Sequence, residues 1–416
     1  VLVIAPVYTD AGDKKNGDNE NDVVRLPAIQ NFSGSDFSVR IPLPLVVSDK
    51  VKAFAPDIIH SHHPYLLGDT AMRTARKRNI PLVFTHHTLY ERYTHYTPID
   101  SSAMKRFAIE LATRYANHCD HVIAPSESIR DLIRNRGVDK PVAIIPTGVD
   151  LDFFAAGKGE LFRHQHGIAT NAFVLGHVGR LAPEKNLDYL ARAVAVFLKK
   201  HSHAIFVVAG EGPSDDAIWR ICEEEGVQNQ LILTGTLTGS NLAHAYDAFD
   251  VFVFASKTET QGMVLTEAMA AGAPVIALDA SGVREVVIDG KNGRLLDENT
   301  SPEQFAQVLK DVFRQTGLLE KWKTSVYETA VDFSRGKSVK RLEHLYQSTI
   351  HDFPGRKTSQ GDEITAWDNL LKAIEIEWDL LVEKARAVIT VGTSDSTDKN
   401  ADEADQGGHY ESKQNA

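Results

Sequence analysis

The sequence predicts an α/β protein with two doubly wound domains that face a cleft, followed by a helical extension. Three observations predict this fold. The chain has 416 residues and 43% hydrophobic content, which is enough to bury more than one core. Short β-branched runs alternate with segments of helical periodicity in two successive series. Turn residues at 146–150 separate the two series, so we place the domain boundary there.

The first domain is expected over residues 1–148. Helical segments such as 102–118 separate its apolar runs, which is typical of a parallel sheet. The expected strands are residues 1–7, 57–60, 81–85, 121–125 and 142–146. A domain of this type normally has a strand and a helix before a strand such as 1–7. We therefore expect the first strand and helix to be missing from this chain.

The second domain is expected over residues 149–335. Its apolar runs are again each followed by a helical segment. The expected strands are residues 173–178, 204–209, 231–234, 251–255 and 274–278. Ligands of such domains bind beyond the carboxyl ends of the strands, so the cleft between the two sheets is the expected site.

The C-terminal extension is expected to contain two helices and a tail. Residues 336–352 should form a helix that packs back on the first domain. Residues 362–389 carry apolar side chains at alternating spacings of three and four, which predicts an amphipathic helix. Its acidic polar face favours packing on protein, in this chain or in an oligomer, over an anionic membrane. Residues 390–416 are expected to be a disordered acidic tail.

Charge and cysteine content restrict the class of protein. The net charge is −11, and residues 352–416 contribute fourteen acidic and seven basic side chains to it. No domain-wide basic field remains for nucleic acid, so we expect no nucleic-acid partner. Cys119 and Cys222 lack metal-ligand or paired spacing, which favours reduced thiols and a cytoplasmic location. No apolar run approaches the roughly 20 residues of a membrane span, so contact with the inner face of the cell membrane would be peripheral.

Two glutamates mark the segment that follows the expected strand 251–255. Glu259 falls in the loop after the strand, and Gly262 allows the backbone to approach a ligand where the next helix begins. Glu267 lies inside that helix, where its carboxylate can face paired hydroxyls such as those of a ribose. Taken alone, this spacing is equally compatible with two solvated glutamates and a glycine that caps a turn.

A second polar segment follows the expected strand 173–178. Arg180 and Lys185 lie between a glycine turn and a helix start, where two cations can neutralise a leaving diphosphate. Taken alone, such a pair is more often found in a solvated turn. Glu211 and Gly212 end another strand, although glycine is common at these turns.

Histidines gather after two strands of the first domain. They are His60, His62 and His63 in one cluster and His86 and His87 in the other. A zinc site would use such His-x-His spacing, but no bridging carboxylate is evident, so we expect no metal. Asp150 and Asp152 form an Asp-x-Asp pattern in the segment between the domains, which we interpret as coincidence.

Together these segments resemble the GT-4 family of retaining glycosyltransferases, over residues 1–350. The spacing from Glu259 to Glu267 matches the family's E-x7-E motif, and the small-residue run 268–274 follows it as in the family. Residues 179–185 resemble its G-R-x-x-x-E-K element, and residues 85–88 resemble the site of a catalytic histidine. The resemblance implies the GT-B fold, with two Rossmann-like domains.

The resemblance also implies roles for individual residues. Glu259 would contact the donor sugar, Glu267 the nucleotide ribose, and Arg180 and Lys185 the diphosphate, with no metal or other cofactor. His87 would approach the donor sugar and the reacting phosphate. The catalytic set is therefore His87, Arg180, Lys185 and Glu259. The donor-binding set is Gly179, Glu211, Gly212, Thr260, Gln261, Gly262, Met263, Val264, Leu265 and Glu267. The acceptor-side set is His62, His63, Tyr90 and Tyr93.

The expected reaction is transfer of a hexose from a nucleotide diphosphate sugar to an acceptor hydroxyl. Residues 88–96 and 259–263 resemble bacterial members that glucosylate diacylglycerol, which implies UDP-glucose and a membrane lipid. Cations at 73–78 and 105–106 would then face the membrane, or form an ordinary solvated surface. A sugar, polyol or cell-wall acceptor, and a non-catalytic nucleotide-sugar-binding scaffold, remain alternatives.

Overall fold

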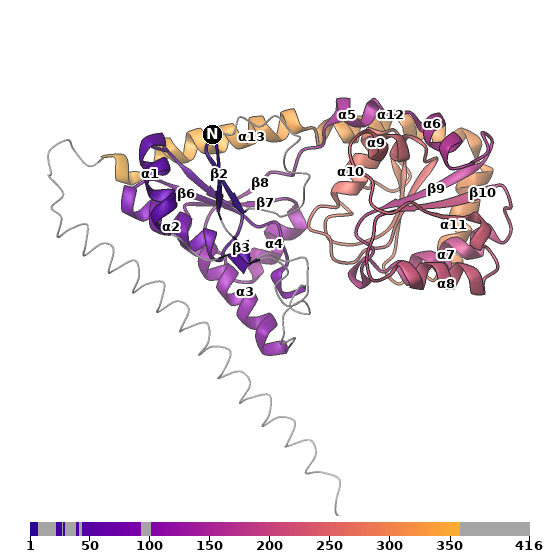
Figure 1. Ribbon diagram of the computed structural model, residues 1–416, viewed down its shortest axis with the longest axis horizontal. Coiled ribbons are helices and arrows are strands. Elements are labelled where there is room, and N and C mark those ends of the chain that lie inside the picture. The colour runs from indigo at the N-terminus through magenta and orange to yellow at the C-terminus, as the bar shows by residue number, and fades with distance from the viewer. Residues whose placement is uncertain (7–21, 27, 30–38, 41–43, 93–100, 358–416) are drawn as a thin grey trace, which may run out of the picture. The chain divides into compact units, whose positions relative to one another are not determined.

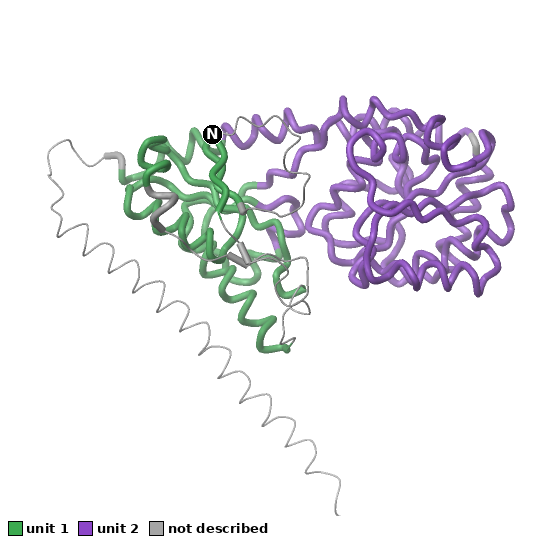
Figure 2. Tube along the Cα trace, viewed as in Figure 1, with its two compact units in different colours: residues 1–123, 132–143, 345–416 green, residues 124–131, 144–344 purple. Residues whose placement is uncertain are grey.

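The computed structural model describes residues 1–6, 22–26, 28–29, 39–40, 44–92 and 101–357. The chain divides into two compact units (Figure 2). Unit 1 comprises Val1–Ile123, Leu132–Ala143 and the chain from Leu345 onward, and unit 2 comprises Ala124–Asp131 and Ile144–His344. Helices α4 (Glu127–Asn135) and α13 (Arg335–Asp352) therefore begin in unit 2 and end in unit 1.

Unit 2 is built on a six-stranded parallel sheet. Its strands are β9 (Phe173–Val178), β10 (Ala204–Ala209), β11 (Leu231–Leu233), β12 (Val251–Phe254), β13 (Val275–Leu278) and β14 (Gly293–Leu296). Their spatial order is β11-β10-β9-β12-β13-β14, so the order of the chain reverses between β9 and β12. In doubly wound sheets, this switch point opens a crevice at the carboxyl ends of the strands.

Helices cover both faces of this sheet (Figure 1). Helix α7 packs against both α8 and α11, and α5, α6, α9, α10 and α12 form a second group. The bounds are α5 Leu151–Ala155, α6 Gly159–Gln165, α7 Leu187–Leu198, α8 Asp215–Glu224, α9 Ser240–Asp247, α10 Met263–Ala270, α11 Pro302–Arg314 and α12 Thr316–Asp332. Every residue of β12 and β13 is buried, because a sheet covered on both faces needs continuous apolar strands.

Unit 1 contains the sheet β5-β6-β7-β8, in which β5, β6 and β7 are parallel neighbours. Its bounds are β5 Ile59–Ser61, β6 Leu82–Thr85, β7 His121–Ala124 and β8 Val142–Ile144. Two smaller sheets pair β1 (Val3–Pro6) with β2 (Val23–Leu26) and β3 (Ala28–Ile29) with β4 (Val39–Arg40). Besides the ends of α4 and α13, the described part of unit 1 contains α1 (Pro44–Phe54), α2 (Leu67–Arg78) and α3 (Ser102–Asn117).

The expected α/β class and parallel sheets are confirmed, and a strand overlaps each of the ten expected ranges, with β5 extending one residue beyond its range. Sequence reasoning missed β2, β3, β4 and β14, because each has only two to four residues and is too short to show a strand period. The helix expected at 362–389 and the tail at 390–416 lie outside the described residues. Within the described ranges, no helix has the length and apolar character needed to cross a membrane.

Candidate functional site

Lys185 and Glu259 meet at the switch point of the unit 2 sheet. Lys185 lies in the turn after β9, and Glu259 lies in the loop after β12. Nζ of Lys185 is 2.6 Å from Oε1 of Glu259. The two side chains are 21% and 13% exposed. A cation and a carboxylate at the carboxyl ends of adjacent strands suit a ligand with both anionic and hydroxyl groups.

The turns after β9 and β10 are joined by backbone hydrogen bonds. The amide of Gly179 donates to the carbonyl of Ala209, and the amide of Leu181 donates to the carbonyl of Glu211, each at 3.0 Å. A Cβ on Gly212 would lie 2.3 Å from the carbonyl oxygen of Leu181, so only glycine fits there. The expected donor-binding residues Gly179, Glu211 and Gly212 are thus brought together.

Helix α10 begins directly after the loop that carries Glu259. Gly262 is its N-cap residue, with φ of +69°, and no side chain caps the first turn. Glycine adopts this left-handed conformation without strain, and an uncapped helix start presents amide donors to anions. The amides of Met263 and Val264 can therefore bind phosphate or sugar oxygens, whereas the amide of Leu265 already donates to the carbonyl of Gly262 at 2.9 Å. The side chain of Met263 is exposed, whereas that of Leu265 is buried.

Glu267 is held by a tyrosine from the neighbouring helix. It is the fifth residue of α10, and its Oε2 accepts a 2.7 Å hydrogen bond from the hydroxyl of Tyr246 on α9. Burial raises the pKa of Glu267, and the hydrogen bond from Tyr246 opposes that shift. Within the described residues, no hydrogen bond reaches its Oε1. That oxygen is therefore available to a ligand hydroxyl.

The loop between Glu259 and Gly262 is fixed by the side chain of Gln261. Its Oε1 accepts from the amide of Thr147 at 2.7 Å, and its Nε2 donates to the Thr147 carbonyl at 2.8 Å. A Cβ on Gly282 would lie 2.7 Å from the backbone nitrogen of Gln261. The Gln261 side chain therefore holds the loop, while the backbone around it is the part suited to a ligand.

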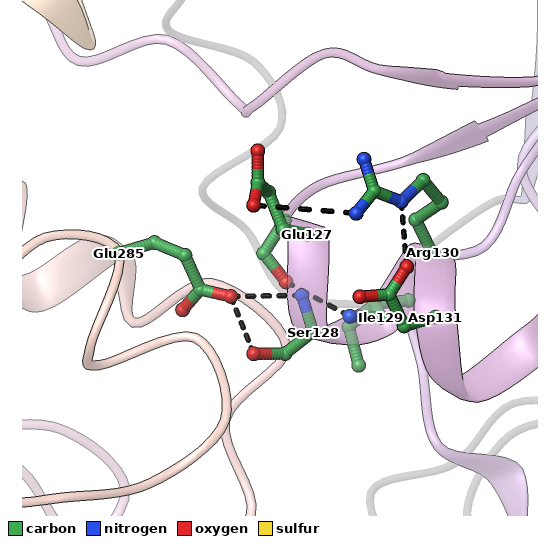
Figure 3. Close-up of polar contacts among 7 residues, drawn as sticks. Glu127, Ser128, Ile129, Arg130, Asp131 and Glu285 are labelled. Atoms are coloured by element: carbon green, nitrogen blue, oxygen red, sulfur yellow. Dashed lines mark hydrogen bonds and ion pairs between the residues drawn. The ribbon is translucent and has the colours of Figure 1, made fainter.

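Two residues at the start of α4, Ser126 and Ser128, form further hydrogen-bonded contacts in unit 2. The hydroxyl of Ser126 accepts from the amide of Ile129 at 3.3 Å and donates to the carbonyl of Thr260 at 2.7 Å. Oε1 of Glu285 accepts from the amide of Ser128 at 2.8 Å and from its hydroxyl at 2.5 Å (Figure 3). These contacts satisfy first-turn amides of α4 and connect it to the loop that precedes α10.

In unit 1, His87 and His62 form a hydrogen-bonded pair. Nδ1 of His62 is 2.9 Å from Nε2 of His87, and the ring centroids are 5.2 Å apart. Burial, followed by the neighbouring His62 and His86, lowers the pKa of His87 to about 4. His87 is therefore neutral near pH 7 and presents one donor and one acceptor nitrogen.

Aromatic rings surround the other expected acceptor-side residues. The ring of Tyr90 lies 5.5 Å from that of His63, 5.1 Å from that of Tyr65 and 5.8 Å from that of His86. Burial raises the pKa of Tyr90, and its hydroxyl has no hydrogen-bond partner among the described residues. Tyr93 lies outside the described residues.

The Asp-x-Asp pattern has a local structural role. Asp150 caps α5 by accepting from the amide of Phe153 at 3.1 Å, and its other carboxylate oxygen lies 3.1 Å from Arg335. In the described part of the chain, no group of three or more histidine, cysteine or acidic side chains is arranged to hold a metal ion.

Sequence reasoning missed several residues that support this site. Tyr246 looks like an ordinary core aromatic in the sequence, and Ser126 and Ser128 look like ordinary turn residues. Tyr246 is 21 residues from Glu267, Ser126 is 134 residues from Thr260, and Ser128 is 157 residues from Glu285. Only Ser126, three residues before the amide it caps, carries the sequence signal of an N-cap.

The sheet order and the polar switch point define the class of protein. The doubly wound sheet of unit 2, with Lys185 and Glu259 at its switch point, agrees with the GT-B glycosyltransferase fold that the sequence resembles. Solved structures support this fold: Anabaena HepE in complex with UDP-glucose superposes with a TM-score of 0.65 at 20% identity, covering 83% of this chain and 99% of that one.

Family comparison agrees with this class. Residues 1–153 match the model described as Glycosyltransferase Family 4, and residues 159–329 match Glycosyl transferases group 1. An alpha-monoglucosyldiacylglycerol synthase of Acholeplasma laidlawii is 27% identical, covering 84% of this chain and 89% of the relative. A GDP-mannose-dependent alpha-mannosyltransferase of Corynebacterium glutamicum is 30% identical, covering 74% and 73%. The chain belongs to the family 4 glycosyltransferases.

Proposed function

We propose that the protein is a retaining, metal-independent hexosyltransferase that moves glucose from UDP-glucose to a lipid hydroxyl, such as that of diacylglycerol. The observation that carries this proposal is the Lys185–Glu259 pair at the switch point, at 2.6 Å, with Glu267 on the following helix. The relatives named alpha-monoglucosyldiacylglycerol synthase support glucose and a lipid acceptor. The UDP and UDP-glucose complexes of HepE support the donor.

Each polar group at the switch point and at the start of α10 has a part in binding this donor. Glu267, oriented by Tyr246, accepts hydrogen bonds from the ribose hydroxyls. The amides at the start of α10, with Arg180 and Lys185, bind the diphosphate, whose negative charge increases as it leaves. Glu259 accepts hydrogen bonds from the sugar hydroxyls. The cations take the place that a metal ion has in other glycosyltransferases.

Transfer then proceeds on one face of the sugar. The bond from the anomeric carbon to the diphosphate breaks, and a new bond from that carbon to the acceptor oxygen forms on the same face. The proton of the acceptor hydroxyl passes to a diphosphate oxygen, so neither glutamate acts as a nucleophile. Neutral His87 donates or accepts a hydrogen bond at the reacting groups. The protein contributes chiefly orientation and charge stabilisation.

The acceptor is proposed to come from a membrane surface. Helix α2 ends in Arg76, Lys77 and Arg78, and α3 carries Lys105 and Arg106 in its first two turns. Such cations are attracted to anionic lipid at the inner face of the cell membrane. Binding to vesicles with anionic lipid should weaken as salt rises, and equal binding to neutral vesicles would contradict a peripheral membrane contact.

A second candidate has the same chemistry with a soluble acceptor. Relatives named D-inositol 3-phosphate glycosyltransferase, 27% identical in Nocardia farcinica, favour a polyol acceptor, and the mannosyltransferase favours GDP-mannose. A third candidate is a scaffold that binds a nucleotide sugar without transfer. Acceptor assays distinguish these three possibilities.

The first experiment is thermal unfolding in chelator with UDP, GDP or ADP. A nucleotide at about 100 times its Kd adds roughly 2.7 kcal/mol of stability. We expect UDP alone to shift the transition, with the shift lost in Glu267→Ala. The exposed Glu223→Ala on α8 is the matched control and should retain it. A shift with none of the nucleotides would contradict the donor site.

The second experiment measures the reaction itself. UDP-glucose is supplied with diacylglycerol vesicles or with soluble sugars and polyols, and the product is analysed by proton NMR. An α-glucosyl lipid is the expected product, since the sugar of UDP-glucose is α-linked. A β-linked product would contradict retention, and loss of activity in chelator would contradict metal independence.

A further inference from the structure

His60 is held at both ring nitrogens by hydroxyl groups. Its Nδ1 lies 2.5 Å from the hydroxyl oxygen of Tyr346, and its Nε2 lies 2.6 Å from Oγ1 of Thr85. Burial, then the neighbouring His62 and His87, lowers the pKa of His60 to about 3. Burial raises the pKa of Tyr346 to about 12. Both groups are therefore neutral near pH 7, and each hydroxyl can match whichever ring nitrogen it faces.

The His60 ring supports the pair that contains His87. The centroids of His60 and His62 are 4.1 Å apart with a tilt of 33°, and His62 is hydrogen-bonded to His87. His62 is an exposed side chain, and an exposed side chain without contacts would sample several rotamers. Its ring contacts among the described residues are with His60 and His87. The orientation of His60 therefore decides which rotamer of His62 can reach His87.

The end of α13 has other contacts in unit 1 besides the hydroxyl of Tyr346. Leu345 and Thr349 on the same helix are 7% and 5% exposed, and they supply buried packing. Oγ1 of Thr349 also lies 3.4 Å from Nδ1 of His121. Phenylalanine at position 346 would retain the ring and lose only the hydroxyl, so it isolates the contact with His60.

We propose that Tyr346, from helix α13, is a positioning residue for His87. Its hydroxyl fixes the ring of His60, His60 packs against His62, and His62 holds His87 by a hydrogen bond. The role of His87 in glucosyl transfer rests on the proposed function. The contact that positions it joins residues 286 positions apart in the chain, so α13 contributes to the reaction through His60 and His62.

Tyr346→Phe in the full chain tests this proposal against Tyr327→Phe. Tyr327 lies on α12 and is 60% exposed, which makes it a matched control for the same chemical change. We expect Tyr346→Phe to lower kcat roughly threefold to tenfold, the effect of one hydrogen bond. The KM for the donor should be unchanged, because the proposed donor-binding residues lie in unit 2. Tyr327→Phe should leave both constants at the wild-type values.

A double-mutant cycle identifies the route of the effect. If Tyr346 acts through His60, then Tyr346→Phe should lower kcat no further in a His60→Phe background. If Tyr346→Phe lowered kcat equally in the wild-type and His60→Phe backgrounds, the proposal would be overturned. Equal kcat values for Tyr346→Phe and Tyr327→Phe would also overturn it. A rise in donor KM with unchanged kcat would also overturn it.

A measurement without turnover separates this proposal from the proposed function. The ring-nitrogen NMR shifts of His62 and His87 report their tautomers and hydrogen bonding. We expect Tyr346→Phe to change both sets of shifts, and Tyr327→Phe to change neither. Unchanged His87 shifts in Tyr346→Phe would overturn the positioning role. Absence of transfer by the wild-type protein would contradict the proposed function instead, and the NMR comparison would still decide the positioning role.

Discussion

The hydroxyl of Tyr246 donates a 2.7 Å hydrogen bond to Oε2 of Glu267, and this contact joins two neighbouring helices of unit 2. The tyrosine is fully buried, and its ring lies 5.4 Å from that of Phe154 and 5.9 Å from that of Phe252. Packing therefore fixes the tyrosine, and the tyrosine fixes one oxygen of the carboxylate. A carboxylate oriented in this way loses little freedom when a ligand binds.

Tyr246→Phe should weaken UDP binding while the fold is retained. The phenylalanine keeps the ring contacts but loses the hydrogen bond, so we expect the UDP affinity to fall roughly threefold to tenfold, or about 1 kcal/mol. Calorimetry with UDP and with 2′,3′-dideoxy-UDP checks the cause, because only UDP has the ribose hydroxyls. Equal weakening for both ligands would indicate a distorted pocket and contradict the prediction. Tyr327→Phe is the control.

Gln261→Met should destabilise unit 2. The substitution removes both hydrogen bonds to the backbone of Thr147 and leaves its amide and carbonyl without partners. We expect the free energy of unfolding to fall by about 2–3 kcal/mol, measured by urea denaturation. The same change at Gln307, which is exposed on α11 and bonds to Asp311 at 2.7 Å, is the control. Equal losses in the two variants would refute a special role for Gln261.

Glu285→Gln should loosen the start of α4. The carboxylate accepts two hydrogen bonds from Ser128, and a neutral amide oxygen accepts them more weakly. We expect the Ser128 amide to exchange with deuterium about fivefold faster, corresponding to about 1 kcal/mol of local stability. Glu223→Gln on α8 is the control and should leave that amide unchanged. Unaltered exchange in Glu285→Gln would show that the contact does not stabilise the helix start.

His177→Phe should reduce the loss of stability in acid. His177 is 1% exposed, its Nδ1 lies 3.1 Å from the Val253 carbonyl, and burial lowers its pKa to about 4. Between about pH 6.5 and 4 the unfolded chain binds a proton at this histidine and the folded chain does not, so this contribution to stability is lost as pH falls.

The size of this effect can be measured by urea denaturation at pH 7 and pH 5. We expect His177→Phe to lose about 2 kcal/mol less stability than the wild-type protein over that interval. Phe252 and Phe254 lie 6.0 Å from the histidine ring, so an aromatic replacement suits the site. His164→Phe, at an exposed position on α6, should retain the wild-type pH dependence. If His177→Phe lost as much stability as the wild-type protein between pH 7 and pH 5, the prediction would be contradicted.

Much of the fold was predictable because its signals are local. The runs that became β9 and β10 occupy the same residues that periodicity predicts, and β12 ends one residue earlier. Gly262 marks the start of α10 because few other residues adopt φ of +69° without strain. That Lys185 and Glu259 lie close together also follows from the sequence, since parallel strands bring their carboxyl ends to one edge of the sheet.

The sequence by itself thus determined the α/β class, the strand runs and the polar residues at the strand ends. Only the tertiary structure decided which distant residues are joined by hydrogen bonds: Tyr246 to Glu267, Gln261 to Thr147, and Tyr346 to His60. Periodicity reports which face of an element is apolar, but not which distant element covers that face. A hydrogen bond between elements depends on their packing to within a fraction of an ångström, and that packing is set by the whole core.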